Sequence, residues 1–117
     1  MNYVDGDVIA VPRENKEKYI ELARNVAAVF KKHGALNLVE CWGDDVPEGK
    51  VTSFPMAVQC KENEVVVFAW ITWPSKAVRD TGMADAMADP LFANQEDPMP
   101  FDGKRMIFGG FQMIVNE

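Results

Sequence analysis

The sequence predicts an α+β fold in which one antiparallel sheet carries two helices on the same face. Two observations lead to this prediction. Four segments have the residue patterns of strands and two longer segments have helical periodicity, in the order strand, helix, strand, strand, helix, strand. The chain has 117 residues, which is the usual size of one domain, so we expect a single domain over residues 1–117.

The first strand and the first helix are both clearly marked. The segment "YVDGDVIAVP" (3–12) alternates along most of its length and ends in proline, as a strand does. Asn15 is a suitable N-cap for a helix over about 16–33, and Gly34 is a suitable stop residue. The apolar residues that recur at helical spacing in this segment are Tyr19, Leu22, Ala23, Val26, Val29 and Phe30.

The middle of the chain predicts two more strands. "ALNLVECWG" (35–43) is the second strand, and the turn-rich segment 44–50 follows it. In segment 53–60, Ser53 can cap a short helix that has Pro55 in its first turn. "EVVVFAWITW" (64–73) is rich in β-branched and aromatic residues and is the third strand.

The last part of the chain predicts a helix, a loop and a strand. Ser75 is the N-cap of a helix over 74–90, which Gly82 weakens by about 1 kcal/mol relative to alanine. A proline-rich loop over 90–103 then leads into a strand that runs from Lys104 to Val115. The complete order is the ferredoxin-like βαββαβ arrangement, an antiparallel sheet with two helices on one face.

The apolar residues of the third and last strands suggest a partner. Both strands are apolar on both sides, whereas both helices cover the same face of the sheet. Leaving six such side chains in water costs on the order of 10 kcal/mol, which rivals the stability of a whole domain. A second copy of the sheet is the simplest cover, so we expect a homodimer whose sheets pair into a dimeric α+β barrel.

Composition excludes several classes of protein. Twelve basic and eighteen acidic residues give a net charge of −6, and no basic patch or stripe suggests a nucleic-acid partner. No apolar stretch approaches the length of a membrane span, and the first residues do not resemble a signal peptide. We therefore expect a cytoplasmic protein in which Cys41 and Cys60 are reduced and buried.

Several motifs together resemble a known family. They are "YVDG" (3–6), "ECWGDDVPEGKVT" (40–52), "WPSK" (73–76) and "MPFDGKRMIFGGF" (99–111). The chain resembles the YbaA-like bacterial family of unknown function over nearly its whole length. Asp7 departs from the family pattern, in which an apolar residue stands there. The resemblance implies the dimeric α+β barrel fold and a homodimer, and it implies no reaction.

Two residues are weak candidates for acid–base catalysis. Glu40 alternates with Leu38 and Trp42 on one face of the second strand, where a carboxylate needs a partner. It can act as a general base if burial raises its pKa, or it can form an ion pair with Lys104 or Arg105. His33, the only histidine, can act as a proton shuttle, but the end of a helix favours a capping role.

Four further residues are candidates for binding a ligand. Trp42 and Trp70 can line a flat apolar site or pack in the core or the dimer interface. Arg79 can bind a ligand carboxylate or, with Asp80, pair with the 101–105 turn, and Arg105 is a further candidate. We expect no bound metal and no cofactor, since neither one histidine nor a two-carboxylate pair at positions 5 and 7 supplies enough ligands.

Two functions remain open on the sequence alone. In the first, the protein binds or converts a small apolar or aromatic molecule in a cavity between sheet and helices, without a cofactor. In the second, the homodimer is a non-catalytic binding or stress-related protein that acts through loops 43–53 and 90–103, which contain four of the seven prolines.

Overall fold

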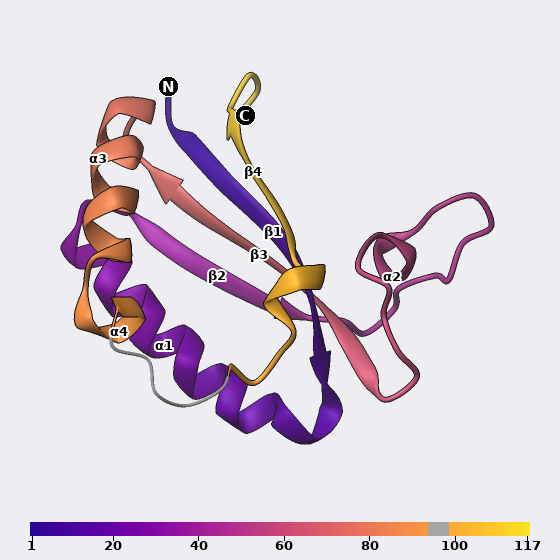
Figure 1. Cartoon of the computed structure of the whole chain (residues 1–117). Helices are drawn as coiled ribbons and strands as arrows, with labels where there is room; N and C mark the ends of the chain where they lie inside the picture. Colours follow the sequence, from indigo (N-terminus) through magenta and orange to yellow (C-terminus); the bar gives the residue numbers. More distant parts are fainter. Residues whose placement is uncertain (94–98) are drawn as a thin grey trace.

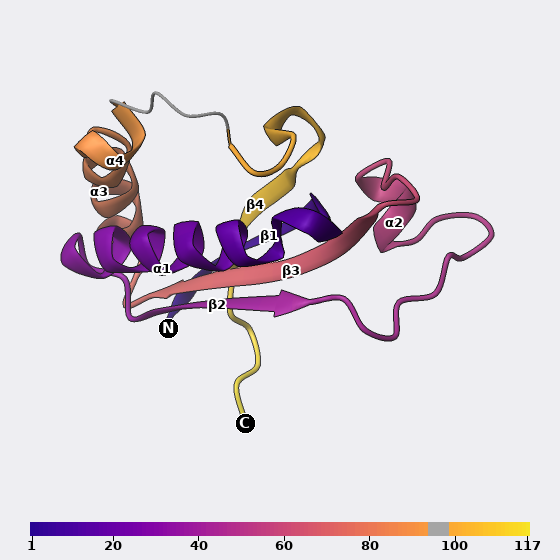
Figure 2. The same ribbon diagram turned by 90° about the horizontal axis from the view of Figure 1, so that it is seen from below.

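The fold is a four-stranded antiparallel sheet with helices on one face. The computed structural model describes residues 1–93 and 99–117, and its strands lie in the order β2-β3-β1-β4. The strands are β1 (Tyr3–Pro12), β2 (Asn37–Trp42), β3 (Glu64–Trp73) and β4 (Ile107–Gln112). The helices are α1 (Lys16–Lys32), α2 (Phe54–Ala57), α3 (Lys76–Met87) and α4 (Pro90–Ala93). Figures 1 and 2 show α1, α3 and α4 together on one face, which confirms the predicted βαββαβ architecture.

Two of the three predicted helix caps form. The hydroxyl of Ser53 accepts from the amide of Met56, and the hydroxyl of Ser75 accepts from the amide of Val78. Asn15 occupies the N-cap position of α1, as predicted, but its side chain makes no capping hydrogen bond. Its side chain instead donates to the carbonyl oxygen of Pro100 at 3.0 Å, which ties the segment before β4 to the start of α1.

Gly82 has a packing role that the helix propensity scale does not show. A Cβ atom at this position would lie 2.6 Å from a ring carbon of Trp73 and would also clash with the carbonyl oxygen of His33. Trp73 is completely buried. The glycine therefore lets α3 pack directly against the indole ring and the end of α1.

The chain before β4 differs from the prediction. The segment predicted as the loop 90–103 contains α4, and residues 94–98 of it lie outside the described residues. Lys104 and Arg105 belong to a 3-10 turn (Gly103–Arg105) rather than to the strand, because the side chain of Asp102 accepts from the amide of Lys104. The strand itself ends at Gln112, before the predicted end.

The face of the sheet opposite the main helices is partly covered. Val58, which follows α2, is fully buried against Val8, Ala10 and Val66. The expectation that this face has no cover of its own is therefore wrong at this end. Other apolar side chains on this face stay exposed: Phe68 by 45%, Ile107 by 43% and Phe111 by 58%. We call these three residues the open face.

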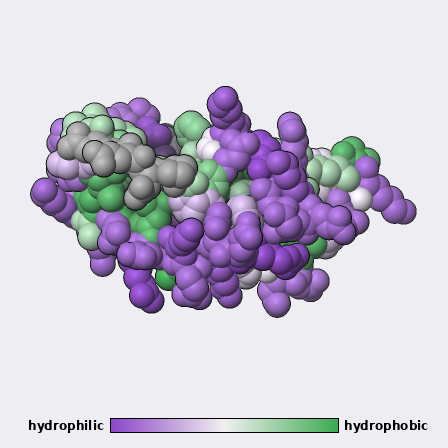
Figure 3. All heavy atoms as spheres, turned by 60° about the horizontal axis from the view of Figure 1, so that its bottom comes forward, coloured by the Kyte–Doolittle hydropathy of each residue, from purple (hydrophilic) through white to green (hydrophobic). Residues whose placement is uncertain are grey.

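The outer surface on the side of α1 is mostly hydrophilic, with smaller hydrophobic patches between the polar side chains (Figure 3). Among the described residues no helix is long and apolar enough to cross a membrane. Both cysteines keep exposed surface, since Cys41 is exposed and Cys60 is partly exposed, so the expectation that they are buried is wrong.

Candidate functional site

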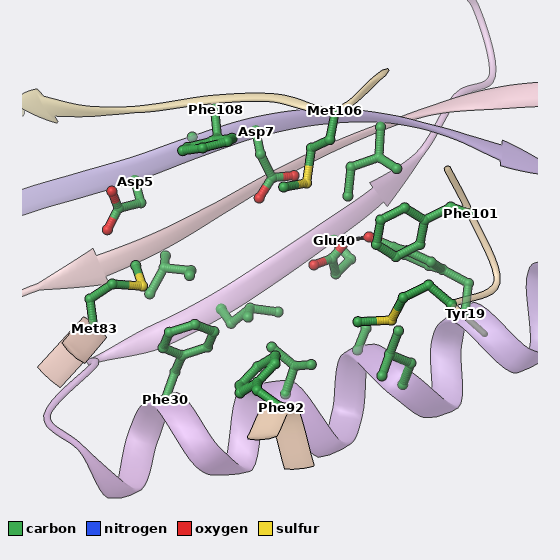
Figure 4. A pocket seen from close by; sticks show the side chains of 18 of the residues that line it. Asp5, Asp7, Tyr19, Phe30, Glu40, Met83, Phe92, Phe101, Met106 and Phe108 are labelled. Carbon is green, nitrogen blue, oxygen red and sulfur yellow. Dashed lines mark hydrogen bonds between the residues drawn. The ribbon is translucent and has the colours of Figure 1, made fainter. Parts of the chain in front are cut away.

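A cavity of about 390 Å³ lies between the helix-covered face of the sheet and α1, α3 and α4. Its walls are mostly apolar, with aromatic side chains and methionines among them (Figure 4). The aromatic residues that line it are Tyr19, Phe30, Phe92, Phe101 and Phe108. Phe108 is 77% exposed, so the cavity meets the surface at the edge strand β4.

The floor of the cavity carries two carboxyl groups in one row across the sheet. Asp7 on β1 pairs with Ala69 on β3, and Ala69 pairs on its other side with Glu40 on β2. The strand spacing places the two acidic residues about 10 Å apart at their Cα atoms. The small side chain of Ala69 leaves the space between them open, and both carboxyl groups point into the cavity (Figure 4).

Glu40 is bound by a tyrosine of α1. The hydroxyl of Tyr19 donates to Oε1 of Glu40 at 2.5 Å. Burial raises the pKa of Glu40, and the hydrogen bond from Tyr19 opposes this rise. Burial and the nearby carboxylate raise the pKa of Tyr19, so its hydroxyl remains the donor. The predicted ion pair of Glu40 with Lys104 or Arg105 is wrong.

Asp7 has an oxygen atom with no partner. Its Oδ1 is buried and accepts no hydrogen bond from any of the described residues. Burial, together with the charges of Glu40 and Asp5, raises its pKa from 3.8 to about 7. Near neutral pH this carboxyl group is therefore present in both its neutral and its ionised form.

Asp5, two residues earlier on the same face of β1, accepts hydrogen bonds at both of its carboxylate oxygens. Arg79 of α3 donates from Nη2 to Oδ1 at 2.8 Å and from Nε to Oδ2 at 3.1 Å. The indole of Trp73 donates to Oδ2 at 2.9 Å. The hydrogen bonds with Asp5 raise the pKa of Arg79. The cavity thus has one neutralised ion pair beside the Asp7 carboxyl.

The environment of Arg79 explains a glycine in β4. The guanidinium lies 5.3 Å from the centre of the Tyr3 ring, and a Cβ atom at Gly110 would lie 2.9 Å from its Nη2. Gly110 faces Asp5 across the ladder, so the absent side chain leaves room for this cluster. Arg79 also binds Asp80, and neither residue pairs with the 101–105 turn as the sequence suggested.

Both tryptophans that were candidate ligand residues lie outside the cavity lining. Trp42 packs at the end of the core, with the ammonium group of Lys16 at 5.1 Å from its ring centre. Trp70 lies on the opposite face of the sheet, with its ring centre 5.7 Å from that of Phe68.

Arg105 and His33 also lie outside the cavity lining. Arg105 forms two hydrogen bonds of 2.7 Å with the buried carboxylate of Glu64 and also binds Asp102. It therefore holds the turn before β4 against the start of β3. His33 lies at the end of α1, with its Nε2 at 4.0 Å from a carboxylate oxygen of Asp89.

Of the six candidate residues, Glu40 and Arg79 line the cavity, and Tyr19 and Asp7 join them. The periodicity of α1 placed Tyr19 on the apolar face but could not show that its hydroxyl meets Glu40. A signal for Asp7 was present, because it alternates with apolar residues on β1. No group of three or more His, Cys, Asp or Glu residues in the described part of the chain could hold a metal ion.

Comparison with sequence families supports the resemblance noted from the motifs. The model of the family described as "Protein of unknown function (DUF1428)" matches residues 2–103. The chain is 56% identical to "Uncharacterized protein YbaA" of Escherichia coli (strain K12) over 117 residues, which cover 100% of both chains. The YbaA protein of Shigella flexneri matches with the same identity and coverage.

Solved structures with low sequence identity share the fold. A point mutant of MhuD with two manganese protoporphyrin IX molecules per active site matches with a TM-score of 0.62 at 12% identity, over 98% of this chain and 97% of the other. A dimeric ferredoxin-like protein from an uncultured marine organism has a TM-score of 0.59 at 13% identity, over 99% and 97%. A mutant of SnoaB, a cofactor-independent oxygenase from Streptomyces nogalater, has a TM-score of 0.56 at 14% identity, over 98% and 95%.

Proposed function

The chain belongs to the DUF1428 family of proteins of unknown function, so its role has to be inferred from its own cavity, and we propose that it binds a small, mostly apolar molecule there. The observation that carries this proposal is the cavity itself. Its volume of about 390 Å³ lies within the range of small-molecule sites, and its walls combine many apolar side chains with a few polar ones.

In this proposal, Asp7 and Glu40 make the polar contacts to the ligand. A carboxyl group with a pKa near 7, like that of Asp7, gains and loses its proton at neutral pH, as a general acid or base must. Proton transfer to or from the bound molecule is therefore the reaction that this site supports best, and it requires no cofactor. SnoaB, named a cofactor-independent oxygenase, shares the fold, but at 14% identity its reaction is not carried over.

The same proposal includes a homodimer. The open face exposes Phe68 on β3 and Ile107 and Phe111 on β4, the two strands that flank β1. Large exposed apolar patches of this kind mark interaction sites in soluble proteins. A solved structure of the same fold is described as dimeric, which supports a second copy as the cover.

Filling the cavity from α1 tests the binding proposal. Ala23 lines the cavity, whereas Ala28 on the same helix is exposed to solvent and does not line it. The fluorescent apolar amine N-phenyl-1-naphthylamine, which is uncharged at neutral pH, is titrated into the wild type, Ala23→Phe and Ala28→Phe. We expect saturable binding that Ala23→Phe weakens at least about tenfold and Ala28→Phe leaves unchanged. Absence of saturable binding, or equal binding by both variants, would contradict the proposal.

A further inference from the structure

The side chains that line the cavity include more acidic than basic groups. The charged or ionisable side chains that line it are those of Asp5, Asp7, Glu40 and Arg79, together with the phenol of Tyr19. The ion pair between Arg79 and Asp5, at 2.8 Å, removes one charge of each sign. The carboxyl groups of Asp7 and Glu40 are left without a cation among the described lining residues.

Oδ1 of the Asp7 carboxyl group has no hydrogen-bond donor among the described residues. Burying a polar oxygen atom without a partner costs free energy, and such atoms are rare in folded proteins. Glu40 accepts from Tyr19, whereas Oδ1 of Asp7 accepts from none of the described residues. A ligand that brings an N–H donor to the cavity floor would satisfy this atom.

Aromatic rings lie close to the two carboxyl groups. Phe108 pairs directly with Asp7 across the ladder between β1 and β4. The ring centre of Phe101 lies 5.7 Å from that of Tyr19, the residue that binds Glu40. In Figure 4 Phe108 is drawn on the side of Asp7, and Phe101 and Tyr19 are drawn on the side of Glu40. Faces of aromatic rings attract organic cations, so they add to the attraction of the carboxylates.

We propose that the ligand is an apolar amine, a hydrophobic or aromatic group that carries a protonated nitrogen, and that its ammonium group binds Asp7 and Glu40. This inference rests on the cavity binding proposed above and adds the chemical class of the ligand. The apolar part of the molecule occupies the space between α1, α3 and the sheet, where the walls are hydrocarbon and thioether.

Binding of such a cation is coupled to the protonation of Asp7. The ammonium group pairs with the ionised carboxylate, so the proton that neutral Asp7 holds passes to solvent when the amine binds. The groups that face Asp7 are Asp5 on its own strand, Glu40 on β2, Tyr19 on α1 and Arg79 on α3. Affinity for the amine therefore rises with pH through about 7.

Three probes with one naphthalene ring and different head groups test this inference. They are 2-naphthylmethylamine, a cation at pH 8, 2-naphthylmethanol, which is neutral, and 2-naphthoic acid, an anion. Each competes against N-phenyl-1-naphthylamine on the wild type, on Asp7→Asn and on Asp45→Asn. The last variant removes the same charge from an exposed loop residue outside the cavity.

We expect the amine to bind about tenfold more tightly than the alcohol, and the acid to bind most weakly. Asp7→Asn should lower the affinity for the amine toward that for the alcohol, because Glu40 alone remains as its carboxylate partner, and Asp45→Asn should change neither. An alcohol or acid that binds as tightly as the amine, or an amine affinity unaffected by Asp7→Asn, overturns the assignment of the ligand class. Failure of all three probes to compete while N-phenyl-1-naphthylamine binds overturns it as well. Failure of N-phenyl-1-naphthylamine itself overturns the cavity binding on which it rests.

Discussion

Asp7 and Glu40 point into one cavity from either side of Ala69, on strands that are not adjacent in the sheet. The alanine side chain is too small to separate them, and burial limits the screening of their charges. The Glu40 carboxylate therefore makes it harder for Asp7 to ionise, in addition to the cost of desolvation. The free protein therefore keeps an electrostatically unfavourable pair of carboxyl groups on the cavity floor. A cation bound there would stabilise their ionised forms.

The raised pKa of Asp7 predicts that removing its charge stabilises the protein. Well below pH 3.8 the carboxyl group is protonated in both the folded and the unfolded state, so its ionisation does not affect folding. As pH rises to about 7, ionisation is easier in the unfolded state, where the pKa is near 3.8, and the wild type loses stability. The shift corresponds to up to about 4 kcal/mol.

Asp7→Asn should therefore be more stable than the wild type at pH 8, and the difference should shrink steadily toward pH 4. Urea unfolding of both proteins at pH 4, 6 and 8 measures this. A difference in unfolding free energy that does not change with pH would show that Asp7 ionises normally in the folded protein.

Removal of the Tyr19 hydroxyl should change the titration of Glu40. The hydrogen bond from Tyr19 is the contact that lowers the pKa of Glu40, so Tyr19→Phe should raise that pKa further. The variant should also lose about 1–3 kcal/mol at pH 8, since a buried carboxylate loses its donor. Carbon NMR of the labelled Glu40 carboxyl group follows the titration. Tyr3→Phe makes the same chemical change at another buried tyrosine and should leave Glu40 unaffected.

The ion pair between Arg79 and Asp5 should be important for stability. Their side chains are 24% and 13% exposed, so removing the guanidinium leaves a poorly solvated carboxylate whose one remaining donor among the described residues is Trp73. Arg79→Met should cost about 3 kcal/mol in the free energy of unfolding. Lys76→Met, on the same helix, removes an exposed partner of Asp80 and should cost less than about 1 kcal/mol. Similar losses for both variants would contradict this ranking.

Substitutions of the two phenylalanines of β4 should distinguish dimer assembly from ligand binding. Phe111 belongs to the open face, whereas Phe108 lines the cavity mouth on the other side of the same strand. Sedimentation velocity should show a dimer for the wild type and for Phe108→Asp, and a 13.1 kDa monomer for Phe111→Asp. Phe108→Asp should instead change binding of N-phenyl-1-naphthylamine. A wild type that sediments as a folded monomer at micromolar concentration would contradict the proposed dimer.

Much of the fold could be predicted because local patterns determine it. The strand bounds 3–12 and 64–73 agree with β1 and β3, since β-branched and alternating residues are bounded there by turn residues. The strand predicted from Lys104 failed for a tertiary reason. Arg105 turns away from the sheet to bind buried Glu64, 41 positions earlier, and no local pattern reports such a contact.

The site was harder to predict for the same reason. Alternation with Leu38 and Trp42 showed correctly which face of β2 carries Glu40. It could not show which helix residue lies above it, because that depends on how α1 crosses the sheet. The bond to Tyr19 and the effect of Glu40 on Asp7 therefore appeared only with the three-dimensional structure.

The methionines provide the most direct test of the cavity. Met83, Met87 and Met106 line it, whereas Met1, Met56 and Met113 do not. In protein labelled with carbon-13 at the methionine methyl groups, addition of 2-naphthylmethylamine or N-phenyl-1-naphthylamine should shift the signals of the first three and leave the second three unchanged. Shifts confined to Met56 and Met113, or no shift at saturating probe, would show that the cavity between the sheet and the helices is not a binding site.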